Sequence, residues 1–171
     1  MQRPVSRSAW LFAALLLSGA ALAGDVLNPA QSATVIGPLN PMLTEGSQQL
    51  EAGHYPEGVR LTLAGLEQPN SVKDQAAAHS NLCAGYVALR QLEEALTHCN
   101  RALELDRSNW RTYNNRAAVF VGMGKYDLAL TDVNAGLELA PDSEILHKSR
   151  QVVLQRHNAA GRERWRKPNK A

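Results

Sequence analysis

The sequence predicts an all-α protein built from repeated pairs of helices, and three observations support this fold class. A pattern of residues between Tyr86 and Leu105 recurs 34 residues further on, between Phe120 and Leu139. A fixed period of this size is typical of repeat proteins whose units are small supersecondary elements. Glycine and proline fall between the predicted helices, and short polar residues precede several of them as candidate caps.

The repeated pattern consists of large, small and acidic positions that match in order. They are Tyr86, Leu92, Ala95, Leu96, Ala102, Leu103, Glu104 and Leu105 in one copy, and Phe120, Tyr126, Ala129, Leu130, Gly136, Leu137, Glu138 and Leu139 in the next. Each unit of such an array stacks on its neighbours, and the stack forms an extended binding surface. The repeat therefore favours a binding protein over an enzyme.

The first 23 residues have the features of a secretory signal peptide. Arg3 and Arg7 precede an apolar run, and the run ends in an A-x-A cleavage site that closes at Ala23. We therefore expect residues 1–23 to be removed and the protein to be exported, to the periplasm or the exterior. The alternative is an uncleaved membrane anchor, but the apolar stretch is shorter than the ~18–20 residues that a span needs.

The charges of the remaining 148 residues are divided unevenly along the chain. Residues 24–147 carry eight basic and fifteen acidic side chains, whereas residues 148–171 carry eight basic side chains and one acid, Glu163. The expected mature protein is thus neutral overall, with an acidic body and a basic end. A segment of this length is one modest domain, and such an asymmetry is typical of an interaction tail.

The elements follow one another along this domain. Residues 24–41 contain several prolines and little periodicity, which predicts a flexible leader. The clearest helical pair comes later: Ser108 or Asn109 can cap a helix that ends near Gly122, and a second helix runs from Tyr126 to Leu139. An equivalent pair is expected near 75–89 and 93–105.

Two further elements complete the prediction. A glycine-rich pair before residue 75 matches the second pair at an offset of 37, and its glycines should make it the least stable unit. A seventh helix should begin at Asp142 or Ser143, because apolar residues such as Leu146 and Val153 share one face. One apolar and one polar face describe a cap at the end of a stack. Residues 159–171 are expected to be a basic, disordered tail.

The repeat resembles the tetratricopeptide repeat (TPR) family, which has two helices in each 34-residue unit. Small residues stand where the helices of each pair cross, as Ala95 and Ala129 do, and large residues fill between them. The resemblance covers about residues 39–143, with units at about 39–75, 76–109 and 110–143. With a cap at 144–158, the predicted repeat domain comprises residues 42–158. It implies an α-solenoid of about three helix-turn-helix units plus the capping helix, with no cofactor and no enzymatic activity.

The resemblance also implies a concave groove lined by the first helix of each unit, where a protein or peptide partner binds. By position the groove residues are Thr44, Ser47, Ser80, Asn81, Ala84, Arg111, Asn114, Asn115 and Ala118. Their hydroxyl and amide groups suit an extended peptide backbone or a C-terminal carboxylate. The alternative is that asparagine is common at these positions whether or not it binds. The family's two-lysine carboxylate clamp is absent.

Cys83 and Cys99 are the two cysteines of the chain, and each lies on one helix of the second pair. An exported protein meets an oxidising compartment, so we expect a disulfide between them. The alternative is a pair of small buried thiols. A zinc site with His79, and with His98 as a further ligand, would instead make a small metal- or redox-active protein. The spacing fits no standard zinc motif, so no metal is predicted.

Arg116 replaces an apolar residue inside a predicted helix, and Asp132 lies on the partner helix of the same unit. Because a half-buried guanidinium needs an acceptor, we predict a structural ion pair between them. The alternative is an arginine that anchors a ligand. No nucleophile elbow, phosphate-binding loop or H-E-x-x-H zinc motif is present in the sequence, in line with a protein that is not an enzyme.

The basic tail combines cations with one amphipathic aromatic residue. Its residues are Arg162, Arg164, Trp165, Arg166 and Lys167. This composition suits peripheral contact with an anionic membrane surface or an acidic partner. The alternative is a solvated terminus. Nucleic acid is not an expected partner of an exported protein.

Overall fold

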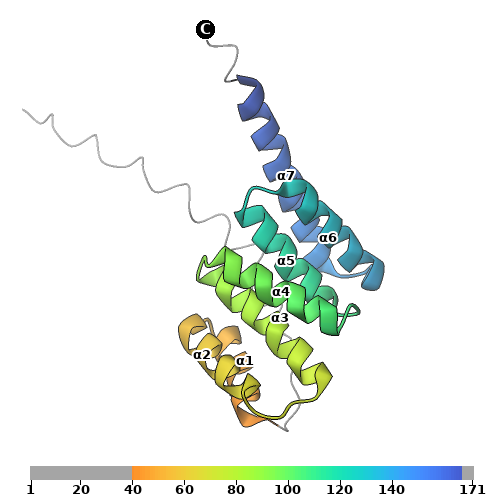
Figure 1. Ribbon diagram of the computed structural model, residues 1–171. Coiled ribbons are helices and arrows are strands. Elements are labelled where there is room, and N and C mark those ends of the chain that lie inside the picture. Colours follow the sequence, from red (N-terminus) through yellow and green to blue (C-terminus); the bar gives the residue numbers. More distant parts are fainter. Residues whose placement is uncertain (1–39, 167–171) are drawn as a thin grey trace, which may run out of the picture.

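The computed structural model describes residues 40–166, which form seven helices and, within that range, no strand (Figure 1). The helices are α1 (Pro41–Glu51), α2 (Tyr55–Leu66), α3 (Val72–Ala88), α4 (Leu92–Leu105), α5 (Trp110–Gly122), α6 (Tyr126–Leu139) and α7 (Glu144–Arg166). The predicted all-α fold class is confirmed. The predicted signal peptide at 1–23, the leader as far as residue 39, and Lys167 lie outside the described residues.

Local capping explains where the first helices begin. Asn40 Oδ1 accepts from the backbone N–H groups of Met42 and Leu43, at 3.1 and 3.2 Å, so α1 starts at Pro41, the last residue of the predicted leader. Ser71 Oγ accepts from Asp74 N at 3.1 Å and starts α3 three residues earlier than the sequence predicts. In each case a side-chain oxygen satisfies first-turn N–H groups that have no partner inside the helix.

The helices form two layers. The first helices of the units, α1, α3, α5 and α7, contact one another in succession, whereas the second helices α2, α4 and α6 contact only first helices. Figure 1 shows the resulting stack, from α1 and α2 at one end to α7 at the other. Because one layer is closely spaced and the other is not, the array curves with the first helices on its inner side. We call this side the inner face.

Each unit reverses direction through a tight turn with one residue in the left-handed conformation. Gly53 (φ 81°) and Gly124 (φ 71°) occupy this position in the first and third units, and Arg90 (φ 60°) occupies it in the second. Glycine adopts a positive φ freely, whereas a Cβ makes it unfavourable. The arginine therefore holds a conformation that the other two units give to glycine.

The glycines of the first unit stand where α1 and α2 cross. A Cβ added to Gly58 would lie 2.6 Å from Leu50 Cγ, and one added to Gly65 would lie 2.6 Å from Leu43 Cδ2. These contacts are shorter than packed side chains allow, so the helices come this close because no side chain intervenes. The lower stability predicted for this unit stays a prediction.

The C-terminal helix differs from the expectation of a short cap and a disordered tail. The backbone is helical without interruption through Ala159, Gly161 and on to Arg166, and the last turns of α7 project beyond the other helices (Figure 1). The predicted boundary at residue 158 is therefore wrong for residues 159–166. The single Gly161 reduces helix propensity by only about 1 kcal/mol, which the long run of arginine, glutamate and alanine around it offsets.

Within residues 40–166, no helix combines the length and the apolar character that crossing a membrane requires.

Candidate functional site

The predicted groove residues lie on the inner face, but most of them are buried. Arg111 and Thr44 are partly exposed. The buried members are Ser47, Ser80, Asn81, Ala84, Asn114, Asn115 and Ala118. Most of the predicted groove positions are therefore packed inside the array.

Hydrogen bonds between neighbouring units account for part of this burial. Thr112 Oγ1 donates to Ser80 Oγ at 2.9 Å, and Asn115 Nδ2 donates to the Ser80 carbonyl at 3.2 Å. On the other side of α5, Ser149 Oγ donates to Asn114 Oδ1 at 2.7 Å. Since buried polar groups need partners, these side chains hold first helices together. Any further role of theirs in binding a partner stays a prediction.

Arg111 is the one cation among the predicted groove residues, and its guanidinium makes no hydrogen bond of this kind to a neighbouring first helix among the described residues. Asn109 Oδ1 accepts from Arg111 N at 3.1 Å and fixes the start of α5. The guanidinium carbon lies 4.4 Å from the centroid of the Trp110 ring, which orients the side chain by a cation–π contact. Its Nε is buried and has no hydrogen-bond acceptor among the described residues. The residue as a whole is partly exposed, so the guanidinium is a cation at the edge of the inner face that lacks an acceptor for its Nε–H among the described residues.

The predicted ion pair of Arg116 is present. Arg116 Nε and Nη2 donate to the two carboxylate oxygens of Asp132, at 2.8 and 2.7 Å. Arg116 Nη1 also donates to Asn100 Oδ1 at 2.9 Å, so one side chain ties α5 to both α4 and α6. The hydrogen bond to Asp132 raises the pKa of Arg116 above its ordinary value. With its donors committed inside the fold, Arg116 is a structural residue and not a free anchor.

The predicted disulfide between Cys83 and Cys99 is also present, and it joins α3 to α4 with a Cα–Cα separation of 5.1 Å. Both cysteines are fully buried, and Ala95 and Val119 pack beside them. The sulfur atoms are bonded to each other and so are not metal ligands. Within residues 40–166, no group of three or more His, Cys, Asp or Glu side chains is placed to hold one metal ion.

His79 and His98 meet directly, which sequence reasoning missed. Nδ1 of His79 lies 2.9 Å from Nδ1 of His98, and the Tyr86 ring lies nearly parallel to the His98 ring with centroids 5.4 Å apart. Burial, then the charges of His98 and Arg101, lower the pKa of His79 to about 4, and burial lowers the pKa of His98. The sequence did contain a signal for this contact. The 34-residue period places His98 at the position equivalent to Asp132, whose side chain faces the first helix of its own unit, so His98 could have been expected to face α3.

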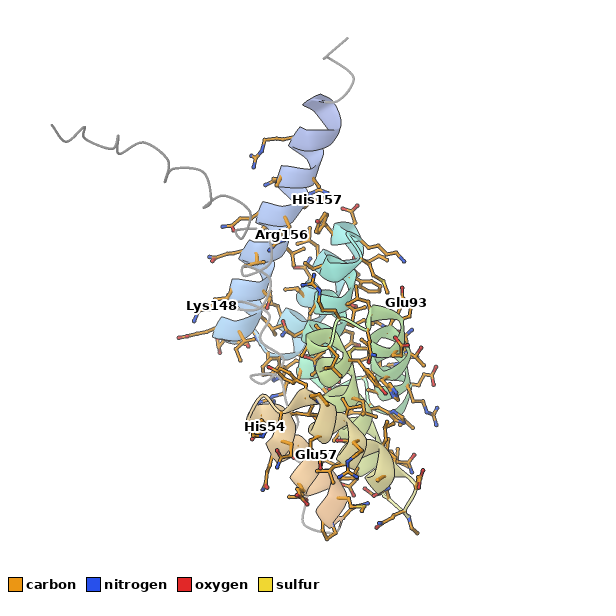
Figure 2. The ribbon with its side chains drawn as sticks, turned by 90° about the vertical axis from the view of Figure 1, so that its left-hand side faces the viewer. His54, Glu57, Glu93, Lys148, Arg156 and His157 are labelled. Carbon is orange, nitrogen blue, oxygen red and sulfur yellow. A yellow bond between two sulfur atoms is a disulfide. The ribbon has the colours of Figure 1, made fainter. Side chains whose placement is uncertain are left out.

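The basic side chains of α7 divide between the stack and the solvent. Arg150 Nε donates to Asn134 Oδ1 of α6 at 3.2 Å, and His157 Nε2 lies 3.3 Å from Asp127 Oδ1. Lys148 is 67% exposed and points away from the stack (Figure 2). Of the predicted tail, Arg162 is exposed, and the backbone carrying Arg164, Trp165 and Arg166 is helical. The structure thus puts cations on a projecting helix.

Comparison with known proteins gives curated relatives and similar solved structures, although no family model matches the chain. The chain is 28% identical over 122 residues to peptidyl-prolyl cis-trans isomerase FKBP4 of Bos taurus, covering 64% of the chain and 26% of the isomerase. It is 32% identical over 108 residues to Hsp70-Hsp90 organizing protein 3 of Arabidopsis thaliana, covering 62% of the chain and 19% of that protein. The chain therefore spans about a quarter or less of these curated relatives.

The similar solved structures agree on the fold. The first TPR domain of human RPAP3 superimposes with a TM-score of 0.62 at 23% identity, covering 69% of this chain and 91% of that domain. A TPR-like protein from Chlorobium tepidum gives a TM-score of 0.60 at 20% identity, covering 70% and 92%. Together with the 34-residue period and the stacked helix pairs, these likenesses show that the chain has the fold of tetratricopeptide-repeat domains.

Proposed function

We propose that this chain is a protein-interaction module that binds an extended segment of a partner along the inner face formed by α1, α3, α5 and α7. The observation that carries the proposal is Arg111. Its Nε is buried without an acceptor among the described residues, while Trp110 holds the guanidinium in place. A buried guanidinium donor is costly without a partner, so the inner face is prepared for a ligand that brings an oxygen atom.

The chemistry of Arg111 narrows the kind of segment that fits. A guanidinium forms its strongest hydrogen bonds with carboxylates, often in pairs, and weaker ones with backbone carbonyl groups. The segment therefore carries an acidic side chain or a C-terminal carboxylate where it passes α5. The polar groups around Arg111 are buried, so the rest of the recognition comes from the shape of the inner face and from partly exposed side chains such as Thr44.

Similar solved structures support a peptide ligand for this face. The first TPR of Spaghetti (RPAP3), with a TM-score of 0.60, was solved bound to the HSP90 peptide SRMEEVD. The second TPR domain of human RPAP3, with a TM-score of 0.58, was solved with the HSP70 peptide SGPTIEEVD. Both peptides end in an aspartate. The two-lysine clamp of the family is absent from this chain, so its own ligand is selected by a single arginine.

The proposal includes no catalysis. The similarity to the FKBP4 isomerase spans only 26% of that protein, which gives no ground for transferring isomerase activity. We also propose that residues 1–23 direct export to the periplasm or the exterior. The buried disulfide between Cys83 and Cys99 supports this location, because disulfides persist in oxidising compartments. N-terminal sequencing of the mature protein tests it: a chain that still begins at Met1 contradicts cleavage after Ala23.

The binding proposal is tested by site-directed photo-cross-linking in cells that express the full chain. A photo-reactive residue at Thr44 samples the inner face, and one at the exposed Glu93 of α4 samples the opposite side (Figure 2). We expect Thr44 to cross-link a partner that Glu93 does not. Arg111→Gln should then weaken binding of that purified partner at least tenfold, while the control Arg101→Gln leaves it unchanged. Cross-links from Glu93 alone, or equal affinities of both variants, overturn the proposal.

A second proposed activity rests on α7, on which Lys148 and Arg162 are exposed and whose sequence continues with Arg164 and Arg166. Each basic residue near an anionic membrane contributes about 1 kcal/mol, and the effect falls with salt. We expect the chain to bind vesicles that contain phosphatidylserine at low ionic strength. Replacing Arg162, Arg164 and Arg166 by glutamine should abolish this binding.

The matched control removes the same amount of charge elsewhere, at the exposed Arg60, Arg101 and Arg107. This control variant should still bind the vesicles. If both triple variants bind equally well, the attraction is not located on α7 and this activity is refuted.

A further inference from the structure

We propose that His79 and His98 form a binding site for a monovalent, two-coordinate metal ion of the Cu(I) type. The site lies between α3 and α4 and is separate from Arg111. Metal binding at this pair therefore does not depend on the proposed peptide-binding function.

The two histidine rings face each other through their Nδ1 atoms. The Nδ1 atoms are 2.9 Å apart and the ring centroids are 5.2 Å apart, with an angle of 25° between the ring planes. The centroid separation exceeds the Nδ1–Nδ1 separation by about twice the distance from the centre of an imidazole ring to one of its atoms, which is the largest excess that two such rings allow. The rings therefore lie edge to edge, with both Nδ1 atoms on the line that joins the centroids. Each ring aims the in-plane lone pair or N–H of its Nδ1 directly at the other.

The two rings are held in this position by their surroundings. The Cys83–Cys99 disulfide fixes α3 against α4 beside the pair, four residues after His79 and one residue after His98. The Tyr86 ring covers one side of the His98 ring at an interplanar angle of 10°. A ligand that bridges two pre-positioned donors loses little conformational freedom on binding.

Both rings are in the state that binds metals. Burial lowers the pKa of His98, and burial together with nearby positive charge lowers the pKa of His79 to about 4, so both imidazoles are neutral at physiological pH. Neutral imidazole is the form that coordinates copper, zinc or nickel. The guanidinium of Arg101, which also depresses the pKa of His79, disfavours a divalent ion more than a monovalent one.

The number of donors selects the ion. Structural zinc takes four ligands, and the described part of the chain offers no group of three or more His, Cys, Asp or Glu side chains. Both thiols are engaged in the disulfide and cannot complete a site. Two nitrogens that face each other in a line match the linear geometry of a monovalent d10 ion. Metal–imidazole bonds of about 2 Å require the nitrogens to move apart by roughly 1 Å, which small χ rotations provide.

Protons balance in this exchange. In the free pair, one Nδ1 carries the proton of the hydrogen bond and the other accepts it. When the metal ion enters, that proton leaves Nδ1 and the same ring takes up a proton from water on Nε2. Both rings then remain neutral, each with an Nε2–H and an Nδ1 bond to the metal. Binding therefore releases no net proton.

The test uses the full oxidised chain with Ag(I) as a redox-stable probe and Cu(I) under anaerobic conditions. Five histidines are present, so their imidazole nitrogens can be followed individually by 15N NMR. We expect the Nδ1 signals of His79 and His98 to shift together and saturate at one equivalent of metal. His79→Gln and His98→Gln should each weaken binding at least tenfold, whereas His54→Gln and His157→Gln should not. Retained far-UV circular dichroism shows whether the variants are folded.

Three results overturn the proposal. The first is an unperturbed histidine pair in the presence of Ag(I), which would leave the pair as a hydrogen bond between helices. The second is zinc bound more tightly than Ag(I), which would require further ligands. The third is loss of binding in Met123→Leu. Met123 packs in the same cluster as Tyr86 and the disulfide, and such a loss would make its thioether the donor instead of the two-coordinate pair.

Discussion

Arg116 on α5 and Arg150 on α7 make the same hydrogen bond one repeat apart. Arg116 Nη1 donates to Asn100 Oδ1 at 2.9 Å, and Arg150 Nε donates to Asn134 Oδ1 at 3.2 Å. Donors and acceptors are both displaced by 34 residues. The contact of Ser149 with Asn114 likewise repeats that of Asn115 with Ser80 at a separation of 35. The seventh helix thus stands as the first helix of a fourth unit and extends the inner face.

The surroundings of Gly58, at the crossing of α1 and α2, and of Gly161, in α7, predict opposite effects for the two glycine-to-alanine changes. Gly58→Ala should destabilise the protein by about 1–3 kcal/mol, because the new Cβ would lie 2.6 Å from Leu50 Cγ and overpack the crossing. Gly161→Ala, with nothing within 4 Å of the added carbon, should stabilise the end of α7, because alanine favours the helix by about 1 kcal/mol. Urea denaturation and amide hydrogen exchange measure the two effects. An unchanged stability of Gly58→Ala would mean that the helices separate freely.

The left-handed Arg90 predicts a stabilising substitution. Its φ of 60° is close to those of Gly53 and Gly124 at the same turn of the other units. Arg90→Gly should raise the midpoint of thermal unfolding, because relief of the left-handed strain, about 1 kcal/mol, exceeds the added freedom of the unfolded chain. Arg107→Gly, at an exposed position in another loop, is the comparison and should not be stabilising. A lower midpoint for Arg90→Gly contradicts this account.

The Arg116–Asp132 pair predicts a large effect from removing one partner. Asp132 is 3% exposed, so Arg116→Ala would leave a buried carboxylate without its main donor. We expect a loss of about 2–4 kcal/mol in the free energy of unfolding. The double variant that also carries Asp132→Asn should recover part of this loss, and a double-mutant cycle quantifies the coupling. Arg60→Ala, which removes an exposed pair with Glu57, should show no comparable change.

The histidine pair predicts a loss of stability in mild acid. The pKa of His79 is about 4 in the folded protein, against an ordinary value of 6.5, so the unfolded chain takes up a proton first. Stability should therefore be complete above pH 6.5 and decline as the pH falls toward 4, with His98 acting in the same direction. Unfolding free energies across this range should show a shallower slope for His79→Gln. The same slope in that variant would assign the acid sensitivity to other groups.

The sequence by itself determined the helices and two of the contacts within units. Capping residues such as Asn109, the glycine turns and the 34-residue period act locally, so they set helix ends to within a few residues. The period also fixes which side of a helix faces its partner, which is why the Cys83–Cys99 and Arg116–Asp132 pairs could be predicted. These contacts join residues only 16 positions apart.

Only the tertiary structure decided what happens between units. The burial of the groove asparagines depends on side chains 32 to 35 residues away on the next first helix, as the contact of Asn115 with Ser80 shows. Inside one unit, the edge-to-edge meeting of His79 and His98 was likewise not predicted, because it depends on rotamers and on the covering Tyr86 ring. A periodic pattern gives the face of a helix but not the direction of each side chain or the distance to the neighbouring unit, because packing against the whole stack sets both.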